Sequence, residues 1–138
     1  MKVHSTEIRV PYADTDRMGI VYHTNYIKYF ETGRAEFLRA AGYPYAQLEA
    51  EGIWLPVMTV QCEYKSPATF DDVLVIETRV GEIKSASIVM VYKIYKKETG
   101  ELVAKGETKH PITDKKLRLV RLKNVKPELL ELLLKACE

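Results

Sequence analysis

The fold of this chain is decided by residues 11–36, which read PYADTDRMGIVYHTNYIKYFETGRAE. Just before this stretch and at its start, Ile8, Val10 and Tyr12 share one face of the chain, and charged residues lie on the other. This period of two predicts a half-buried strand over residues 6–12. Aspartates and a glycine then interrupt the alternation, which is typical of a turn. The stretch therefore leads from a strand, through a polar turn, into the segment that follows.

The second half of the stretch predicts a helix over residues 26–41. Its apolar residues recur at spacings of three, four and seven, which places them on one stripe. The stripe consists of Ile27, Phe30, Phe37, Leu38 and Ala41. We expect Asn25 to be the N-cap and Gly42 to end the helix. Gly33 lies inside the helix, where it costs about 1 kcal/mol relative to alanine, and a close approach to another backbone is expected to offset that cost.

The rest of the chain predicts mainly β structure. A short helix is expected over residues 44–51. Segments rich in Val, Ile, Tyr and Thr, separated by turn signals, then predict strands over 55–65, 73–83, 86–97, 101–112 and 115–123. A C-terminal helix over about 127–137 completes a single domain spanning residues 1–138. This order is typical of an α+β fold, in which an antiparallel sheet is covered by helix on one face.

One predicted strand is apolar on both faces. From Ser87 to Tyr95, residues of both alternating sets are mostly Ile, Val, Met or Tyr. Such a strand needs cover on both sides. The helix over 26–41 covers one side, and few elements remain for the other. We therefore expect a partner subunit.

Composition excludes several classes of protein. Hydrophobic residues make up 46% and charged residues 29%, with a net charge of +2, which argues against disorder and against a nucleic-acid partner. The longest apolar run, residues 88–92, is far short of the roughly 20 residues of a membrane span. The N-terminus is polar and lacks the pattern of a secretion signal, so a cytoplasmic location is expected. Cys62 and Cys137 are expected to be reduced thiols, and no metal site is expected.

The turn over residues 14–25 invites comparison with a calcium-binding loop. Asp14, Asp16 and Gly19 match three positions of an EF-hand. However, a methionine occupies the next ligand position, and Asn25 stands where a bidentate glutamate is needed. The spacing therefore argues against calcium.

Two interpretations of the turn remain. In the first, it is an ordinary structural turn in which Asp14 accepts backbone N–H bonds. In the second, it is a catalytic site, because a helix N-terminus supplies free N–H donors that stabilise a developing oxyanion. A carboxylate just upstream can act as nucleophile or general base on the same substrate. Together these groups suffice for acyl transfer to water.

The turn and helix resemble the signature of the 4-hydroxybenzoyl-CoA thioesterase family, a branch of the hot-dog-fold acyl-CoA thioesterases. The matching residues are Asp14-Thr15-Asp16, Gly19, Val21-Tyr22-His23, Asn25-Tyr26, Phe30-Glu31, Arg34 and Glu36. The Tyr22-His23 pair is similar to the subgroup that includes the thioesterase of the bacterial Tol–Pal gene cluster. A weaker match joins Tyr64, Pro67-Ala68, Asp71-Asp72 and Leu74.

The resemblance implies a curved antiparallel sheet wrapped around a long central helix. It also implies an acyl-CoA thioesterase that releases a free carboxylic acid and coenzyme A, without a metal or other cofactor. The protein is then a homodimer or homotetramer, with active sites at the dimer interface. The alternatives are a non-catalytic module that binds acyl-CoA or acyl-carrier protein, and, ranked lower, a hot-dog enzyme of another type such as a dehydratase.

The resemblance also assigns roles to residues of this chain. Asp16 is the expected catalytic acid, and the backbone N–H of His23 is expected to hold the thioester carbonyl. Whether the carboxylate attacks directly or activates water stays open. The expected substrate-binding residues are Tyr22, Asn25, Lys65 and Ser66. If Asp16 is inert, an acid on the helix is the alternative, namely Glu31 or Glu36.

A basic segment lies near the end of the chain. Six lysines and arginines and no acidic residue occur between Lys115 and Lys126. One interpretation is an exposed strand face with solvated charges. The other is attraction of the phosphates of coenzyme A, because lysine and arginine suit phosphate recognition.

Overall fold

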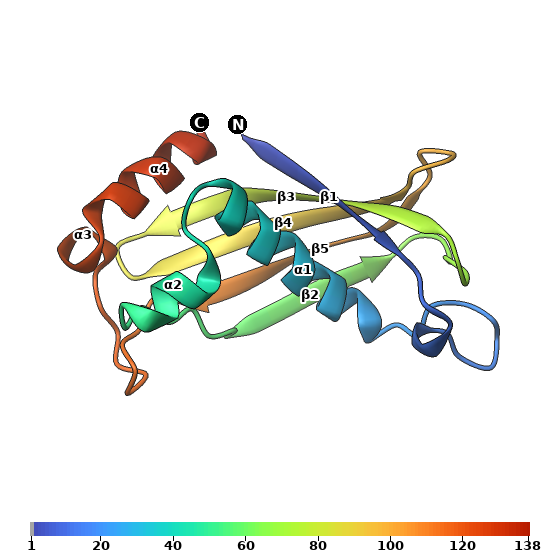
Figure 1. Ribbon diagram of the computed structural model, residues 1–138, viewed down its shortest axis with the longest axis horizontal. Coiled ribbons are helices and arrows are strands. Elements are labelled where there is room, and N and C mark those ends of the chain that lie inside the picture. Colours follow the sequence, from blue (N-terminus) through green and yellow to red (C-terminus); the bar gives the residue numbers. More distant parts are fainter. Residues whose placement is uncertain (1) are drawn as a thin grey trace.

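The computed structural model describes residues 2–138, which form a five-stranded antiparallel sheet with helices on one face (Figure 1). The strand order is β1-β3-β4-β5-β2. The strands are β1 (Val3–Arg9), β2 (Thr59–Tyr64), β3 (Val73–Lys84), β4 (Ser87–Lys96) and β5 (Leu102–Pro111). The helices are the 3-10 turn η1 (Tyr12–Asp14), α1 (Asn25–Ala40), α2 (Tyr45–Ala50), α3 (Leu122–Val125) and α4 (Pro127–Cys137).

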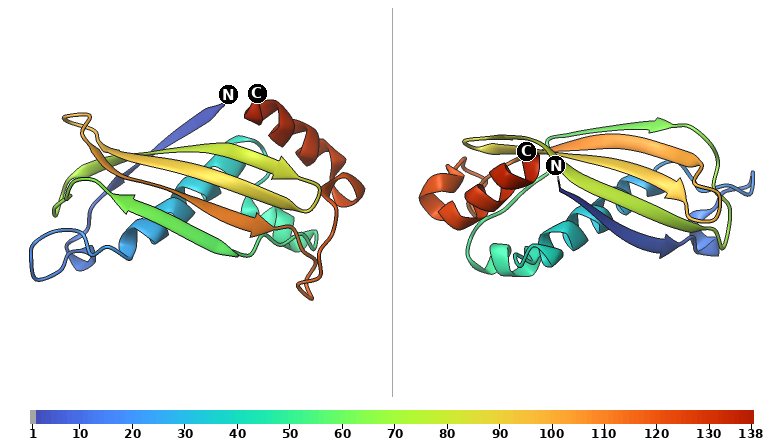
Figure 2. Two further views of the ribbon diagram at one scale, coloured as in Figure 1. Left: turned by 180° about the vertical axis from the view of Figure 1, so that it is seen from behind. Right: turned by 90° about the horizontal axis from the view of Figure 1, so that it is seen from above.

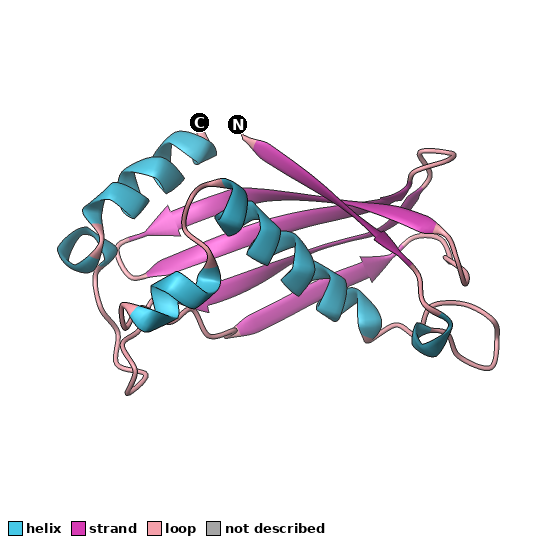
Figure 3. Cartoon of the chain, viewed as in Figure 1, coloured by secondary structure: helices cyan, strands magenta, loops and turns pink. Residues whose placement is uncertain are grey.

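The long helix α1 lies diagonally across the concave face of the sheet. Figure 2 shows α1 and α2 together on that face, while α3 and α4 pack at one end of the sheet. The chain ends meet there, and the Lys2 backbone N–H donates to the Ala136 carbonyl at 3.0 Å. Figure 3 shows the same two layers, with the loops gathered at the two ends of the sheet. The α+β hot-dog architecture expected from the sequence is therefore confirmed.

Gly33 allows α1 to lie close to the sheet. A Cβ atom added there would lie 2.5 Å from Thr78 Oγ1 and 2.7 Å from Ile76 Cγ2, both on β3. These distances are shorter than any real carbon contact allows. The expected close approach at Gly33 is thus present, but it is made to side chains of β3 and not to another backbone.

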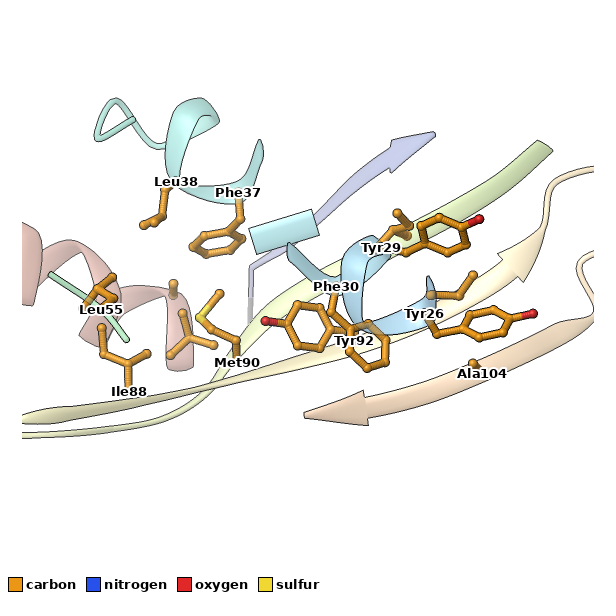
Figure 4. Close-up of a cluster of buried hydrophobic side chains, with 14 of the residues drawn as sticks. Tyr26, Tyr29, Phe30, Phe37, Leu38, Leu55, Ile88, Met90, Tyr92 and Ala104 are labelled. Carbon is orange, nitrogen blue, oxygen red and sulfur yellow. The ribbon is translucent and has the colours of Figure 1, made fainter. Parts of the chain in front are cut away.

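Aromatic packing holds the middle of α1 on the sheet. The rings of Phe30 on α1 and Tyr92 on β4 stack at 4.4 Å between centroids and 10° between planes. Figure 4 shows the two rings at the centre of the buried cluster. A Cβ at Gly106 on β5 would lie 2.8 Å from the Phe30 ring, so glycine there makes room for it. The helix is therefore positioned by two glycines and one aromatic stack.

A buried polar chain runs beneath α1 from Tyr92 to the backbone of Leu55. The Tyr92 and Thr108 hydroxyls lie 2.6 Å apart, and the Thr108 hydroxyl lies 2.7 Å from His110 Nε2. His110 Nδ1 lies 3.3 Å from the Leu55 carbonyl oxygen. Burial, with a smaller contribution from the nearby Arg34 cation, lowers the pKa of His110 to about 4. His110 is therefore neutral at physiological pH, and its ring forms part of the buried hydrogen-bond chain of the core.

Several local expectations were wrong. Residues 115–123 do not form a strand: the segment begins with a turn, because the Asp114 carboxylate accepts the backbone N–H groups of Lys116 and Arg118, and it ends in the first residues of α3. Leu117 there has a φ of 62°, which an extended strand does not allow. Tyr12, assigned to a buried face, is 75% exposed because β1 ends at Arg9 and the chain turns away.

Helix α1 matches the expected bounds within one residue, although two members of its apolar stripe, Ile27 and Ala41, are not buried. Phe30, Phe37 and Leu38 are in the core, whereas Ile27 is 40% exposed. Gly42 follows the helix with a φ of 91°, as expected for a C-terminal stop.

The two faces of β4 differ in the described chain. The face toward α1 is buried through Ile88, Met90, Tyr92 and Ile94. The outer face is only half-buried at Val89, Val91 and Tyr95. Charged residues surround it, since Lys93 pairs in register with Glu77 on one side and Lys105 on the other. Cover of this face by a partner subunit stays a prediction.

We expect Gly33→Ala to destabilise the protein by about 1–3 kcal/mol, because the new methyl group overlaps Thr78 and Ile76. This cost exceeds the gain of about 1 kcal/mol in helix propensity. Urea unfolding measures the effect. In the double variant with Thr78→Ala, part of the clash disappears, so the combined loss should be smaller than the sum of the two single losses. A Gly33→Ala protein as stable as the wild type would contradict the close packing.

We expect protonation of His110 alone to lower the free energy of unfolding by up to about 3 kcal/mol as the pH drops from 6.5 to 4. The sign follows because the folded state binds this proton more weakly than the unfolded chain does. Unfolding by urea at a series of pH values in this window measures the slope. His110→Gln keeps a polar side chain but does not titrate, so its slope should be smaller. Equal slopes in the two proteins would refute the assignment.

Candidate active site

The loop between β1 and α1 carries the candidate active-site residues, and Asp14 anchors it. The Asp14 side chain is buried, and its carboxylate accepts hydrogen bonds from Lys28 Nζ at 2.7 Å and from the Tyr29 hydroxyl at 2.8 Å. Its backbone carbonyl accepts the Tyr22 N–H at 2.9 Å and Asn25 Nδ2–H at 2.8 Å. Asp14 was expected to accept backbone N–H groups in the structural interpretation, but its carboxylate instead binds two side chains of α1.

The electrostatics of Asp14 follow from these contacts. Burial raises the pKa of the Asp14 carboxyl, but the hydrogen bonds from Lys28 and Tyr29 and the charge of Lys28 outweigh it, so the pKa is lowered overall. Burial and the neighbouring carboxylate raise the pKa of Tyr29. The Asp14 carboxylate is therefore charged at neutral pH, and both of its oxygens accept hydrogen bonds from α1.

Asp16 lies two residues further on, at the more exposed part of the loop. Its backbone N–H donates to the Ile20 carbonyl at 2.9 Å, and its carbonyl accepts the Gly19 N–H at 3.0 Å. Its Oδ1 accepts the Met18 N–H at 2.9 Å. Gly19 has a φ of 80°, which closes the tight turn. Unlike Asp14, the Asp16 carboxylate is half-buried and makes no ion pair within residues 2–138.

His23 lies two residues before the first residue of α1, Asn25. The His23 carbonyl accepts the Tyr26 N–H at 3.3 Å and the Tyr64 hydroxyl at 3.0 Å. The His23 N–H itself donates to no acceptor among residues 2–138. A free N–H at the positive end of a helix is a suitable donor for an oxyanion.

Asn25 was expected to cap this helix, and that expectation was wrong. Helix α1 begins at Asn25, and Thr24 before it makes no side-chain capping bond. The Asn25 amide donates instead to the Asp14 carbonyl. Its side chain therefore links the helix to the loop.

A groove of about 350 Å³ opens beside His23. Its lining is mostly apolar and aromatic, and it consists of Ile20, Val21, His23, Tyr26, Tyr64, Lys65, Ser66 and Pro67. The groove thus joins the end of the loop and the start of α1 to the end of β2. An apolar groove next to a free N–H donor suits an acyl group whose carbonyl points at that donor.

The structure brings together three of the predicted site residues in this groove, namely His23, Lys65 and Ser66. The Ser66 hydroxyl donates to the Leu102 carbonyl at 2.7 Å, and Lys65 Nζ lies 2.9 Å from a Glu63 carboxylate oxygen. Both side chains therefore already have partners within the chain.

The other predicted residues lie beside the groove and do not line it. Tyr22 is 46% exposed and its ring packs against that of His23 at 4.5 Å between centroids. Asp16 is joined to the groove through Ile20, to which its backbone is bonded. In a single chain, Asp16 and the groove therefore lie next to each other without forming one closed cavity.

The basic segment does not contribute to this groove. In Figure 1 the loop near residues 113–121 lies at the opposite end of α1 from the loop that carries Asp16. Two of its cations are also neutralised, since Arg118 pairs with Asp114 at 3.2 Å and Lys126 with Glu51 at 2.7 Å. Most of these charges are exposed, as one interpretation expected, but they lie on a turn and the short helix α3 and not on a strand.

Two groups of residues around the site had no role assigned from the sequence. Tyr26 and Tyr64 form the aromatic wall of the groove, with ring centroids 5.5 Å apart, and burial raises the pKa of Tyr26 to about 12. Lys28 binds Asp14. A lysine in the first turn of a helix interacts unfavourably with the helix dipole. This unfavourable position was the only feature of the sequence that could have pointed to a role for Lys28.

The thioesterase-like superfamily profile matches residues 10–133 of this chain. The chain belongs to this superfamily. The family expected from the turn and helix is therefore confirmed. The acyl-CoA thioesterase YbgC of Haemophilus influenzae is 37% identical over 91 residues, which cover 65% of this chain and 67% of that protein.

Solved structures of this superfamily agree with the fold. The structure of DHNA-CoA thioesterase from Staphylococcus aureus matches with a TM-score of 0.92 at 31% identity, covering 98% of this chain and 91% of that chain. A 4-hydroxybenzoyl CoA thioesterase matches with a TM-score of 0.83 at 23% identity, covering 96% of this chain and 99% of that one, and so shares its fold. Within residues 2–138 of this superfamily member, no helix is long and apolar enough to cross a membrane.

Proposed function

We propose that this protein is an acyl-CoA thioesterase in which the Asp16 carboxylate and the His23 backbone N–H are the reacting groups. Thioester hydrolysis is the activity named for relatives such as YbgC. The observation that carries the site assignment is the His23 N–H, which has no acceptor within residues 2–138 and lies at the N-terminus of α1 beside the apolar groove. The half-buried Asp16 is the nearest carboxylate in sequence that is not already paired.

The proposed reaction adds water to the thioester. The carbonyl oxygen accepts the His23 N–H, which stabilises the negative charge that develops on it. The Asp16 carboxylate takes a proton from water, and the hydroxide oxygen bonds to the carbonyl carbon. The carbon–sulfur bond then breaks, and the departing thiolate of coenzyme A takes up the proton. Alternatively the carboxylate bonds to the carbonyl carbon first, the carbon–sulfur bond breaks and the thiolate departs. Water then hydrolyses the resulting anhydride to the free acid, and the proton released passes to the thiolate.

The groove receives the acyl group in this proposal. Tyr26 and Tyr64 offer apolar ring faces to it, and Tyr22 packs at its edge against His23. Lys65 at the rim exchanges its exposed contact with Glu63 for the phosphates of coenzyme A, while Ser66 and Asn25 hold the surrounding backbone. Aliphatic and aromatic acyl groups both suit such a lining, so a panel of acyl-CoA substrates decides between them.

We further propose that two copies associate through β2. This strand lies at the edge of the sheet and, among residues 2–138, pairs with β5 alone. Large apolar side chains are exposed along and before it, namely Val57, Met58, Val60 and Tyr64. An unpaired apolar edge is a template for pairing with another strand. Antiparallel pairing of two β2 strands makes one ten-stranded sheet and brings the second copy to the groove, whose wall includes Tyr64.

The cytoplasm is the proposed location. Cys62 and Cys137 are both free thiols. Unpaired cysteines are usual in a reducing compartment, which supports this location.

We expect Asp16→Asn to lower kcat by about 10²–10⁴-fold, the usual contribution of a general base. Release of free thiol from a panel of acyl-CoAs measures the rate. Asp71→Asn is the matched control, because it makes the same change in an exposed turn residue whose carboxylate pairs with Arg9. His23→Ala retains the backbone N–H, so its kcat should fall far less than that of Asp16→Asn.

Two outcomes would contradict these assignments. Undiminished turnover in Asp16→Asn removes Asp16 from its role and directs attention to Glu31 or Glu36. Tight binding of acyl-CoA by the wild-type protein without any turnover favours the alternative, a non-catalytic binding module.

We expect the wild-type protein to sediment at about twice its chain mass of 15.8 kDa or above. The double variant Met58→Lys, Val60→Lys places two cations on the apolar edge and should shift the protein toward the monomer. Val3→Lys makes a similar change on β1, the other edge of the sheet, and should leave the mass unchanged. A wild-type monomer at micromolar concentration would refute self-association.

A further inference from the structure

Lys28 occupies a place that α1 by itself disfavours. It is the fourth residue of the helix, where the partial positive charge of the N-terminus repels a cation. Its side chain is 54% exposed, yet its ammonium lies 2.7 Å from Asp14 Oδ1. Lys28 and its neighbour Tyr29 bind opposite oxygens of that carboxylate. The bond to Asp14, and not helix propensity, therefore accounts for a lysine here.

Asp14 in turn closes the loop into a ring. Its carbonyl is bonded by Tyr22 and Asn25, which lie at the far end of the loop, and its carboxylate is bonded by Lys28 on the helix beyond. The backbone from Asp14 to Asn25 thus returns to its own starting point. Within residues 2–138, Lys28 is the only cation that bonds to the Asp14 carboxylate, and its side chain is 54% exposed.

The two proposed reacting groups are both held inside this ring. Thr15 and Val21 form an isolated antiparallel bridge, and Asp16 N–H donates to the Ile20 carbonyl within it. His23 follows Tyr22, whose N–H is bonded to Asp14. The separation between the Asp16 carboxylate and the His23 N–H therefore depends on how firmly Asp14 is held.

We propose that Lys28 is a positioning residue for thioester hydrolysis. It holds the Asp14 carboxylate and so fixes the separation between the Asp16 carboxylate and the His23 N–H. The inference rests on the function proposed above and concerns the same site. Lys28 contacts no substrate in this proposal. It also supplies the charge that balances Asp14, so that the loop carries one unpaired carboxylate and not two. A displacement of about 1 Å in such a site costs about 100-fold in rate.

Lys28→Met tests the proposal, because it keeps the aliphatic stem and removes the ammonium. We expect kcat to fall by about 10- to 100-fold with KM changed less than about twofold, since geometry and not substrate binding is lost. The melting temperature should stay within about 4 °C of the wild type, because a half-exposed ion pair contributes little stability. Lys28→Arg restores the charge and should recover most of kcat.

Arg39→Met is the matched control on the same helix. Arg39 pairs with Glu36 at 3.4 Å at the other end of α1, so its loss should leave kcat unchanged. Equal kcat in Lys28→Met and wild type, or an equal loss in Arg39→Met, would overturn the positioning role. So would a Lys28→Met protein whose lost rate is fully explained by unfolding at the assay temperature.

A readout without substrate separates this inference from the proposed function. Amide hydrogen exchange at Tyr22 and Asp16 reports the bonds to the Asp14 and Ile20 carbonyls. Exchange at both should accelerate at least about tenfold in Lys28→Met and not in Arg39→Met. If exchange is unchanged, the positioning role fails even where Asp16→Asn confirms the catalytic site. If exchange accelerates while Asp16→Asn is fully active, the loop anchor stands and the assignment of Asp16 fails.

Discussion

The close contact of α1 with the sheet is the constraint on which the rest of the structure depends. Gly33 brings the helix backbone against the side chains of Thr78 and Ile76, and Phe30 fills the space above Gly106 and stacks on Tyr92. Because interiors are densely packed, such a contact leaves a helix little freedom to slide or rotate. The N-terminus of α1 is thereby held at one place above the sheet, with its free N–H beside the end of β2.

The candidate site uses this fixed helix end as its reference. Asp14 ties the preceding loop to α1 through Lys28 and Tyr29, so Asp16 takes its place relative to the helix. The groove wall comes from a different part of the chain, because Tyr64 donates to the His23 carbonyl across 41 residues of sequence. The proposed site of the chemistry therefore lies where a rigid helix end, an anchored loop and an edge strand meet.

Much of the fold was predictable because its signals are local. Apolar periodicity located α1 within one residue, and segments rich in Val, Ile, Tyr and Thr between turn signals located β3, β4 and β5 closely. Prediction failed where a single side chain redirected the backbone. Asp114 binds two following N–H groups and makes a turn of a segment that alternates like a strand. Asn25 has the residue type of an N-cap but bonds to Asp14 instead.

The sequence by itself determined most of the order of elements, through apolar patterns and turn signals along the whole chain, and the superfamily, through the spacing of residues 14–36. Asp16 and the His23 N–H are the reacting groups that the resemblance of this segment implies. Only the tertiary structure decided that Lys28 binds Asp14, that Tyr64 lines the groove, and that the basic segment lies at the far end of α1. The reason is physical, since contacts between distant residues depend on how helix and sheet pack and leave no periodic signal in the chain.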